Sequence, residues 1–282
     1  MNLQKLEDRI TEKHNTNCTI GISTLLTPNN PFQGVSKLLK ADLNVRRIEI
    51  ALAKQLKDEE RIVQSLVDLK TEHELQYSVH APFLYDDLAH PKEPIRDIFV
   101  NEGKKAIDFA TKIGASHTVF HPGELFFRQN LPPLQLFDSF KQPRGSYLDN
   151  SLKSLKRLSN YASQNGIDLL IENQPHGLCD RHEEIKYLSS QLENADFLLD
   201  IGHANISGSL EDLLKLNPQN FHFSDNDGKE DLHRQLGAGT IDLTWVMDRL
   251  LDYKESKEII FELYSLKDVL ASIEVLKTKL GI

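Results

Sequence analysis

Six segments of the sequence end an apolar, strand-like run on residues that can bind a metal ion or move a proton. The runs YSVH, TVFH, LLIE, FLLD and IIFE each stop at one histidine or carboxylate, and FHFSD passes through a histidine to Asp225. These positions are His80, His121, Glu172, Asp200, His222 and Glu262. One such residue commonly marks only where a strand meets solvent, but six in succession indicate a shared site. Imidazoles and carboxylates that converge within a few ångströms typically bind Zn²⁺, Mn²⁺ or a similar divalent ion.

Two neighbouring segments add residues of the same chemistry. In LLDIGHAN, His203 follows Asp200 after a turn of small residues. In HFSDNDGKEDLHRQLGAGTIDL, Asp231 and His233 form a D-x-H pair on a polar, glycine-rich loop. A D-x-H pair has little specificity by itself, but this one lies between His222 and Glu262. We therefore expect all three residues to join the site.

The elements that must position these residues alternate strictly along the chain. The predicted strands span residues 19–23, 47–51, 76–80, 117–121, 167–172, 197–200, 220–224 and 258–262. The predicted helices span residues 34–42, 57–72, 94–113, 148–165, 181–192, 208–216, 241–253 and 266–279. This alternation predicts a parallel sheet covered by helices. Eight units favour a closed (β/α)8 TIM barrel, whose strands all open their carboxyl ends on one face.

An open, doubly wound sheet is the alternative fold. It is disfavoured because no glycine-rich dinucleotide-binding turn follows any predicted strand. No Pro-, Gly- or Ser-rich linker divides the chain, so we predict one domain over residues 1–282, with residues 1–17 as an N-terminal extension. Residues 122–145 are the most irregular stretch, and we predict a long loop there, over the mouth of the barrel.

Composition narrows the function classes. The chain of 282 residues has 33 Lys and Arg against 42 Asp and Glu, a formal charge of −9, which argues against a surface committed to nucleic acid but allows a locally basic cleft. Cys18 and Cys179 lie too far apart in sequence to suggest a thiolate zinc site or a disulfide framework. We find neither a signal peptide nor a run of membrane-spanning length, so we predict a cytoplasmic protein without a membrane partner. The oligomeric state stays open.

Several of these segments together resemble a known superfamily. They are SVHAPF, FHPGE, LIEN, LLDIGHAN, HFSDNDGKEDLH and FEL. From about residue 18 onward the chain looks like the xylose isomerase-like TIM barrels, which include sugar (phosphate) isomerases and epimerases and the endonuclease IV type of abasic-site nuclease (AP endonuclease family 2). The motifs are highly specific for the superfamily and less specific for the reaction.

The resemblance implies a core for one divalent metal ion, Zn, Mn or Mg, made of Glu172, Asp200, His222 and Glu262. In the isomerase and epimerase branch the substrate is a small sugar or sugar phosphate. Glu172 and Glu262 would then form an enediolate, one taking a proton from carbon and the other returning it. His203 would hold a substrate oxygen. The segments LDIGHAN and HFSDNDGKEDLHRQLGAGTIDL are more similar to this branch.

The nuclease branch is the alternative, and nucleic acid is a predicted partner only under it. Further ligands would build a cluster of up to three zinc ions, at His80, His121, His203, Asp231 and His233. Phe83 and Leu84 stand where that branch inserts side chains into the DNA stack. However, STLLTPNNPF replaces the glycine-rich signature of the nucleases, and ALAKQLKDEE lacks the basic and aromatic residues of a DNA-penetrating loop. A non-catalytic, metal-holding barrel is the third reading.

Overall fold

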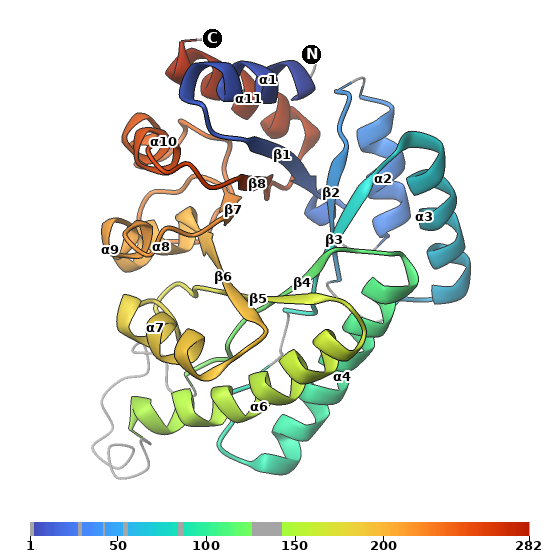
Figure 1. Cartoon of the computed structure of the whole chain (residues 1–282), viewed down its shortest axis with the longest axis vertical. Helices are drawn as coiled ribbons and strands as arrows, with labels where there is room; N and C mark the ends of the chain where they lie inside the picture. Colours follow the sequence, from blue (N-terminus) through green and yellow to red (C-terminus); the bar gives the residue numbers. More distant parts are fainter. Residues whose placement is uncertain are drawn as a thin grey trace.

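The eight strands close into a single barrel surrounded by helices. A computed structural model describes residues 3–27, 30–41, 43–52, 56–83, 87–125 and 143–281. The strands run in the order β1 to β8 around a closed ring, and every neighbouring pair is parallel. Figure 1 shows this ring viewed along its axis, with the helices outside it. The predicted single-domain (β/α)8 TIM barrel is confirmed.

The strands lie within one or two residues of their predicted bounds. They are β1 Cys18–Ser23, β2 Arg47–Ala51, β3 Gln76–His80, β4 His117–Phe120, β5 Asp168–Glu172, β6 Ala195–Asp200, β7 Asn220–Phe223 and β8 Lys257–Phe261. Their central residues are almost all buried on both faces, as strands are between a barrel interior and a layer of helices. Because β4 ends at Phe120 and β8 at Phe261, His121 and Glu262 lie one residue beyond these strands, at the start of the loops that form the mouth.

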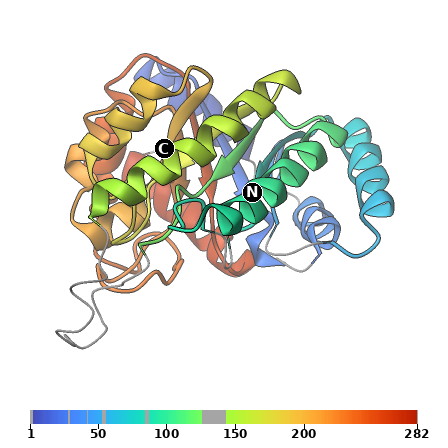
Figure 2. The same ribbon diagram turned by 90° about the horizontal axis from the view of Figure 1, so that it is seen from below.

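Helices follow most strands and cover the outside of the barrel. They are α1 Leu3–His14, α2 Pro31–Leu39, α3 Glu59–His73, α4 Glu93–Lys112, α6 Arg144–Gln164, α7 His182–Gln191, α8 Ile201–Ser207, α9 Leu210–Leu214, α10 Leu243–Leu251 and α11 Leu266–Leu280, with a 3-10 turn η1 at Thr24–Leu26. Figures 1 and 2 both show α4 and α6 lying side by side. Among the described residues, no helix is long and apolar enough to cross a lipid bilayer.

Side-chain caps explain two differences between the predicted and the observed helices. The predicted helix at 34–42 begins at Pro31, since the Asn30 side chain accepts a hydrogen bond from the Gln33 N–H and proline suits the first turn. The turn expected after Asp200 is instead the helix α8, because the Asp200 carboxylate accepts the His203 N–H at 2.7 Å. The predicted helix at 208–216 is the short α9, which follows α8 after Gly208.

Most of the N-terminal extension is a helix that packs on the barrel. Leu3, Leu6 and Ile10 are buried along one face of α1. Glu7 accepts a hydrogen bond from the Ile20 N–H of β1, and Lys13 bonds to the Leu280 carbonyl of α11. In Figure 1 the two terminal helices accordingly lie next to each other. The apolar spacing in α1 was visible in the sequence, but the strongly polar composition of the segment concealed it.

The loop predicted at 122–145 falls largely outside the described residues, which omit 126–142. Its last two residues are helical, because α6 begins at Arg144. The Arg144 guanidinium donates hydrogen bonds to the carboxylates of Asp180 and Glu184 and to the Gly177 carbonyl, which ties the start of α6 to the loop after β5 and to α7.

Candidate active site

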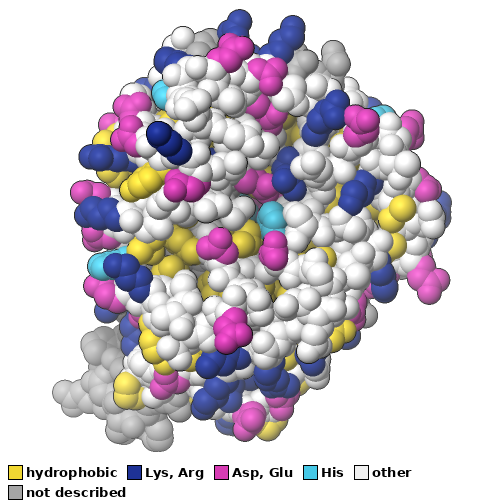
Figure 3. Space-filling view, in the orientation of Figure 1, with side chains coloured by type: hydrophobic (Ala, Val, Ile, Leu, Met, Phe, Trp, Pro, Cys, Tyr) yellow, Lys and Arg dark blue, Asp and Glu magenta, His cyan; other side chains and the backbone are white. Residues whose placement is uncertain are grey.

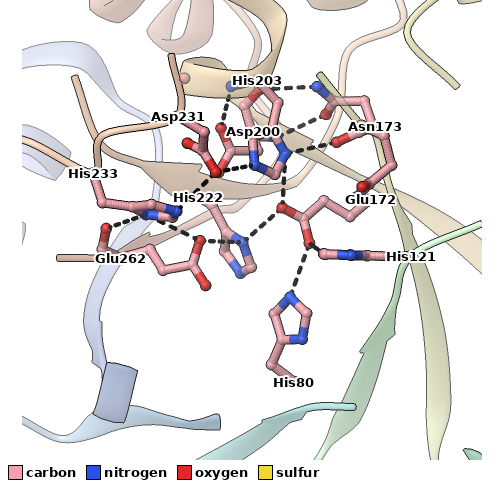
Figure 4. Close-up of polar contacts among 12 residues, drawn as sticks. His80, His121, Glu172, Asn173, Asp200, His203, His222, Asp231, His233 and Glu262 are labelled. Atoms are coloured by element: carbon pink, nitrogen blue, oxygen red, sulfur yellow. Dashed lines mark hydrogen bonds and ion pairs between the residues drawn. The ribbon is translucent and has the colours of Figure 1, made fainter. Parts of the chain in front are cut away.

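Glu172, the last residue of β5, lies at the centre of the mouth and contacts four imidazoles. Its Oε2 atom is 3.0 Å from His80 Nε2 and 3.1 Å from His121 Nε2. Its Oε1 atom is 3.3 Å from both His222 Nδ1 and His203 Nδ1. The Glu172 side chain is fully buried beneath them. Figure 4 shows the four rings arranged around this one carboxylate, which joins β3, β4, β5 and β7 with the start of α8.

Glu262 approaches the same group from β8. Its Oε2 atom lies 3.4 Å from His222 Nδ1 and 3.8 Å from His233 Nδ1. The His222 Nδ1 atom is therefore within reach of Glu172 and of Glu262, whose strands are separated around the ring. One ligand atom each from Glu172, Asp200, His222 and Glu262 lies within 4.8 Å of all the others. This set is the four-residue core that the family resemblance implies.

Asp200 presents one oxygen to this core without a partner. Its Oδ1 atom accepts the His203 N–H, whereas its buried Oδ2 atom has no hydrogen-bond partner within the described part of the chain. Asn173 holds the Asp200 backbone on both sides, donating to its carbonyl at 3.0 Å and accepting from its N–H at 2.8 Å. A buried, unpaired carboxylate oxygen is costly unless a ligand or cation satisfies it. The donor set and this free oxygen both fit a divalent cation.

The remaining predicted residues form two further groups beside the core. Asp231 Oδ2 lies 3.2 Å from His203 Nε2 and 3.1 Å from His233 Nε2. These three residues could hold an ion, as could His80 and His121 with Glu172. A fourth possible group joins His80 and His222 with Glu262. The structure thus brings together every residue that the sequence analysis placed in the site.

Three of the histidines are oriented by backbone carbonyls. The Nδ1 atoms of His80, His203 and His233 lie 2.8, 2.8 and 2.9 Å from the carbonyl oxygens of Ala81, Asn173 and Glu262. A carbonyl only accepts, so each Nδ1 carries a proton and donates it. Each Nε2 atom is thereby directed at a carboxylate, which is how proteins orient histidines that bind metal.

Neighbouring carboxylates shift the pKa values of most of the site's histidines. Burial alone would lower the pKa of His80 and of His233, but hydrogen bonds to Glu172 and Asp231 and the nearby charges raise each pKa to about 9. In the same way, carboxylates overcome burial and raise the pKa of His203 and His222 well above the ordinary value. His121 is the exception: burial prevails there and lowers its pKa despite the contact with Glu172.

The pKa values of the carboxylates are shifted as well. Burial would raise the pKa of Glu172, but the imidazoles of His222 and His121 hold it well below the usual range. His222 likewise overcomes burial and lowers the pKa of Glu262 to about 2. Burial raises the pKa of Asp200 to about 6. Without a metal ion, protons on the histidines balance the negative charge of the carboxylates, so a cation would replace protons on binding.

A cavity of about 680 Å³ opens above the core. His80, His121, Glu172, His203, Asp231, His233 and Glu262 line it, while Asp200 and His222 are fully buried below. Leu25, Phe83 and Tyr264 supply apolar walls, and the Tyr264 ring packs 5.0 Å from the His233 ring. Phe83 contacts His80 edge-on. Leu84, predicted beside it, lies outside the described residues.

The sequence analysis missed Glu49, which contacts the core from β2. Its side chain is fully buried, and its Oε2 atom lies 3.2 Å from His222 Nε2. A glutamate in the middle of RIEIA was a visible signal, but in an isolated strand it would equally fit a solvent-facing position. His117, by contrast, belongs to a different place: it begins β4 and lies 3.7 Å from Glu258, away from this cavity.

Comparisons with known proteins agree with this architecture. A family model described as a xylose isomerase-like TIM barrel matches residues 39–279. The chain is 27% identical over 233 residues to MJ1311, an uncharacterized protein of Methanocaldococcus jannaschii, covering 78% of this chain and 75% of that protein.

Solved structures show the same fold. A D-tagatose 3-epimerase-like protein superposes with a TM-score of 0.79 at 24% identity, covering 93% of this chain and 97% of that chain. The 3-keto-D-glucoside 4-epimerase YcjR of E. coli gives 0.70 at 15% identity, covering 93% and 99%. The IolI protein, solved with a zinc atom, gives 0.69 at 18%, covering 93% and 95%. Because the family model covers most of its length, this chain belongs to the xylose isomerase-like TIM barrel family.

Proposed function

We propose that this protein is a divalent-metal-dependent isomerase or epimerase of a small sugar or sugar phosphate. The observation that carries the proposal is the placement of Glu172 and Glu262 on either side of His222 Nδ1, at 3.3 and 3.4 Å, beneath an open cavity. Two carboxylates that face one substrate from different strands can remove a proton from carbon and return it. The sugar epimerases among the similar folds support the same reaction class.

The proposed metal site consists of Glu172, Asp200, His222 and Glu262. Zinc, manganese or magnesium bound there would supply positive charge that stabilises the negative charge developing on the substrate oxygens. The unpaired Oδ2 atom of Asp200 supports this assignment. The zinc atom in the similar fold of IolI supports it as well.

The protein residues divide the remaining tasks. The carboxylate of Glu172 or Glu262 accepts the carbon-bound proton, and the other carboxylate serves the opposite face of the sugar. His203 has its Nδ1 proton committed to the Asn173 carbonyl, which leaves Nε2 facing Asp231 and the cavity, where it holds a substrate oxygen. Leu25, Phe83 and Tyr264 supply apolar surface against which the carbon atoms of the substrate can pack.

A hydrogen-exchange assay tests this proposal. The metal-loaded protein is incubated in D₂O with a panel of ketoses, aldoses and their phosphates, and deuterium incorporation at carbon is followed by NMR. Glu172→Gln and Glu262→Gln should each lower the exchange rate by about 10²- to 10⁴-fold. Glu230→Gln is the matched control, because Glu230 lines the same cavity outside the proposed ligand set. An E262Q protein with full activity on an identified substrate would overturn the proposal.

The panel also separates sugars from sugar phosphates. Within the described lining of the cavity, Lys229 is the single lysine or arginine, and its side chain is exposed at the rim. A phosphorylated substrate would find its counter-charge there. Lys229→Ala should then raise KM for a phosphorylated sugar and leave KM for its neutral counterpart unchanged.

A zinc phosphodiesterase acting on abasic DNA is the second candidate. The observation that favours it is the pair of further ligand groups, His203–Asp231–His233 and His80–His121–Glu172, because one ion cannot use all of these residues. Clustered metals could activate water for an in-line displacement. Against it, Lys and Arg are interspersed with Asp and Glu over the face drawn in Figure 3. Cleavage of abasic duplex DNA by the zinc-loaded protein at low ionic strength would favour this candidate.

A further inference from the structure

Glu49 is a carboxylate buried inside the barrel. It lies in the centre of β2, and its neighbours Ile48, Ile50 and Ala51 have no exposed surface either. β2 and β7 are not adjacent in the ring, so the contact between Glu49 and His222 crosses the barrel interior. A charged group in such a place is expensive unless a specific partner requires it.

Among the residues that the structure describes, His222 is the one hydrogen-bond partner of the Glu49 side chain. Glu49 Oε2 lies 3.2 Å from His222 Nε2, and Glu49 Oε1 is buried without a hydrogen-bond partner among the described residues. The opposite ring nitrogen, Nδ1, faces Glu172 and Glu262. His222 therefore sits between the proposed metal site on one side and Glu49 on the other.

The other oriented histidines of the site are held by weaker, uncharged acceptors. His80, His203 and His233 donate their outward proton to backbone carbonyls. In His222 the outer ring nitrogen, Nε2, instead faces the side-chain carboxylate of Glu49. A carboxylate on the outer nitrogen of a metal-binding histidine fixes its tautomer and ring orientation and makes its inner nitrogen a better ligand.

The barrel interior below Glu49 accommodates its charge. Arg47 precedes Glu49 by two residues on the same strand, so the two side chains share a face, and Arg47 pairs with Glu258 at 2.8 Å. Burial raises the pKa of Glu258, Arg47 opposes that rise and the nearby Glu49 adds to it. Gly21 of β1 leaves room for Arg47, because a Cβ atom there would lie 2.6 Å from Arg47 Cγ. Positive charge near Glu49 reduces the cost of burying it.

We propose that Glu49 is a positioning residue: it holds His222 in the tautomer and orientation that direct Nδ1 at the metal site. This inference rests on the proposed function only in treating His222 as a ligand. Glu49 touches neither substrate nor metal, because the imidazole ring stands between them. The sugar reaction therefore depends on Glu49 through the affinity and geometry of the metal site.

Metal affinity measured by competition with a chromophoric chelator tests the role of Glu49. Glu49→Leu should weaken zinc or manganese binding by about 10- to 100-fold. Glu49→Gln should weaken metal binding less than Glu49→Leu does, because the glutamine amide oxygen can still accept the Nε2 proton of His222. Glu258→Gln is the matched control, a partly buried carboxylate of the same interior with no hydrogen bond or ion pair to His222 among the described residues, and it should bind the metal with the affinity of the wild type. The unfolding midpoint of the metal-free E49L protein reports separately on stability.

NMR of the zinc-loaded protein provides a second readout in the milder variant. The proton on His222 Nε2 should give a slowly exchanging resonance that shifts in E49Q and not in E258Q. Equal metal affinity in E49L and the wild type, or an unchanged resonance in E49Q, would overturn the positioning role. A wild type that binds no divalent cation would overturn both proposals. Weakened binding in E49L with no reaction on any sugar would support the positioning role while removing the proposed function.

Discussion

The Nε2 atom of His80 lies 3.0 Å from the Oε2 atom of Glu172, which joins the ends of β3 and β5 at the mouth of the barrel. Both side chains are almost completely buried, so unfolding transfers their charges to water. Together with the contacts that Glu172 makes with His203 and His222, whose pKa values are also raised, it indicates that the metal-free protein keeps Glu172 charged by holding protons on these three histidines.

The stability of the metal-free protein should therefore depend on pH in a defined way. Although burial opposes it, contact with Glu172 raises the pKa of His80 to about 9, so its contribution is complete below about 6.5, the ordinary value, and is lost between 6.5 and 9. Contact with His222 similarly overcomes burial and lowers the pKa of Glu262 to about 2, so its contribution is complete above 4.5 and is lost as the pH falls towards 2. Urea unfolding after chelator treatment should show these two losses, one as the pH rises from 6.5 towards 9 and the other as it falls from 4.5 towards 2.

His80→Gln is the control for that profile. It removes the imidazole that titrates, so the fall in stability between pH 6.5 and 9 should become shallower in this variant. A wild-type protein as stable at pH 9 as at pH 6 would contradict the protonated state that we assign to these histidines.

The number of ions per chain should distinguish the core from the group around Asp231. Under the proposed function, Asp200→Asn should abolish tight metal binding, because Asp200 belongs to the core. Asp231→Asn should leave one ion per chain, because the hydrogen-bond partners of Asp231 in the described part of the chain, His203 and His233, form a group separate from Asp200 and Glu262. Elemental mass spectrometry of gel-filtered protein measures both counts. Two or three zinc ions in the wild type, with fewer in D231N, would instead support the nuclease candidate.

The loop that carries Asp231 and His233 is held by one buried carboxylate. Asp225 Oδ2 accepts from the N–H groups of Gly237 and Gly239 at 2.9 and 3.0 Å, and Oδ1 accepts from that of Ile241. Asp225→Ala would leave these donors unpaired and should cost about 2–5 kcal/mol of stability. Amide hydrogen exchange should accelerate at residues 237–241.

Asp227→Ala provides the comparison for that loop. Asp227 also accepts backbone hydrogen bonds, from Lys229 and Glu230, but it is exposed, so exchange at residues 237–241 should not change. If D225A and D227A exchanged alike, the Asp225 carboxylate would not be what holds the loop.

The strand ends of the site were predictable because a parallel barrel imposes its own geometry. An apolar run that stops at Glu172 or Asp200 places that residue at the mouth once the strands close into a ring. The ring itself followed from the alternation of strands and helices. The sequence therefore predicted which residues would meet, while their roles as ligands or catalysts remain proposals.

Three features were not predicted from the sequence: a contact across the barrel interior, a residue that both faces the site and caps a helix, and a helix within a polar segment. Glu49 meets His222 only because closure of the ring brings the inward side chains of the non-adjacent strands β2 and β7 together in the barrel interior. Asp200 both faces the core and caps α8, so the short turn expected after it is helical. In α1, buried Leu3 and Leu6 are surrounded by charged residues, which hides a packed helix in a polar segment.

The interior beneath the site should tolerate no side chain at Gly21. A Cβ atom there would lie 2.5 Å from Ile260 Cδ1 and 2.8 Å from the Arg47 carbonyl oxygen, and the backbone contact cannot be relieved by a rotamer change. Gly21→Ala should destabilise the protein by about 1–3 kcal/mol.

The matched control for this change is Gly145→Ala. No atom lies within 4 Å of a Cβ built at Gly145, which is in the first turn of α6, so alanine should stabilise the helix by up to about 1 kcal/mol. Urea denaturation of both variants measures the difference.

Because Gly21 also makes room for Arg47, G21A should weaken metal binding slightly, whereas G145A should leave it unchanged. A G21A protein as stable as the wild type would mean that β1 and β2 can separate without cost, contrary to the close packing that places Arg47 beneath Glu49.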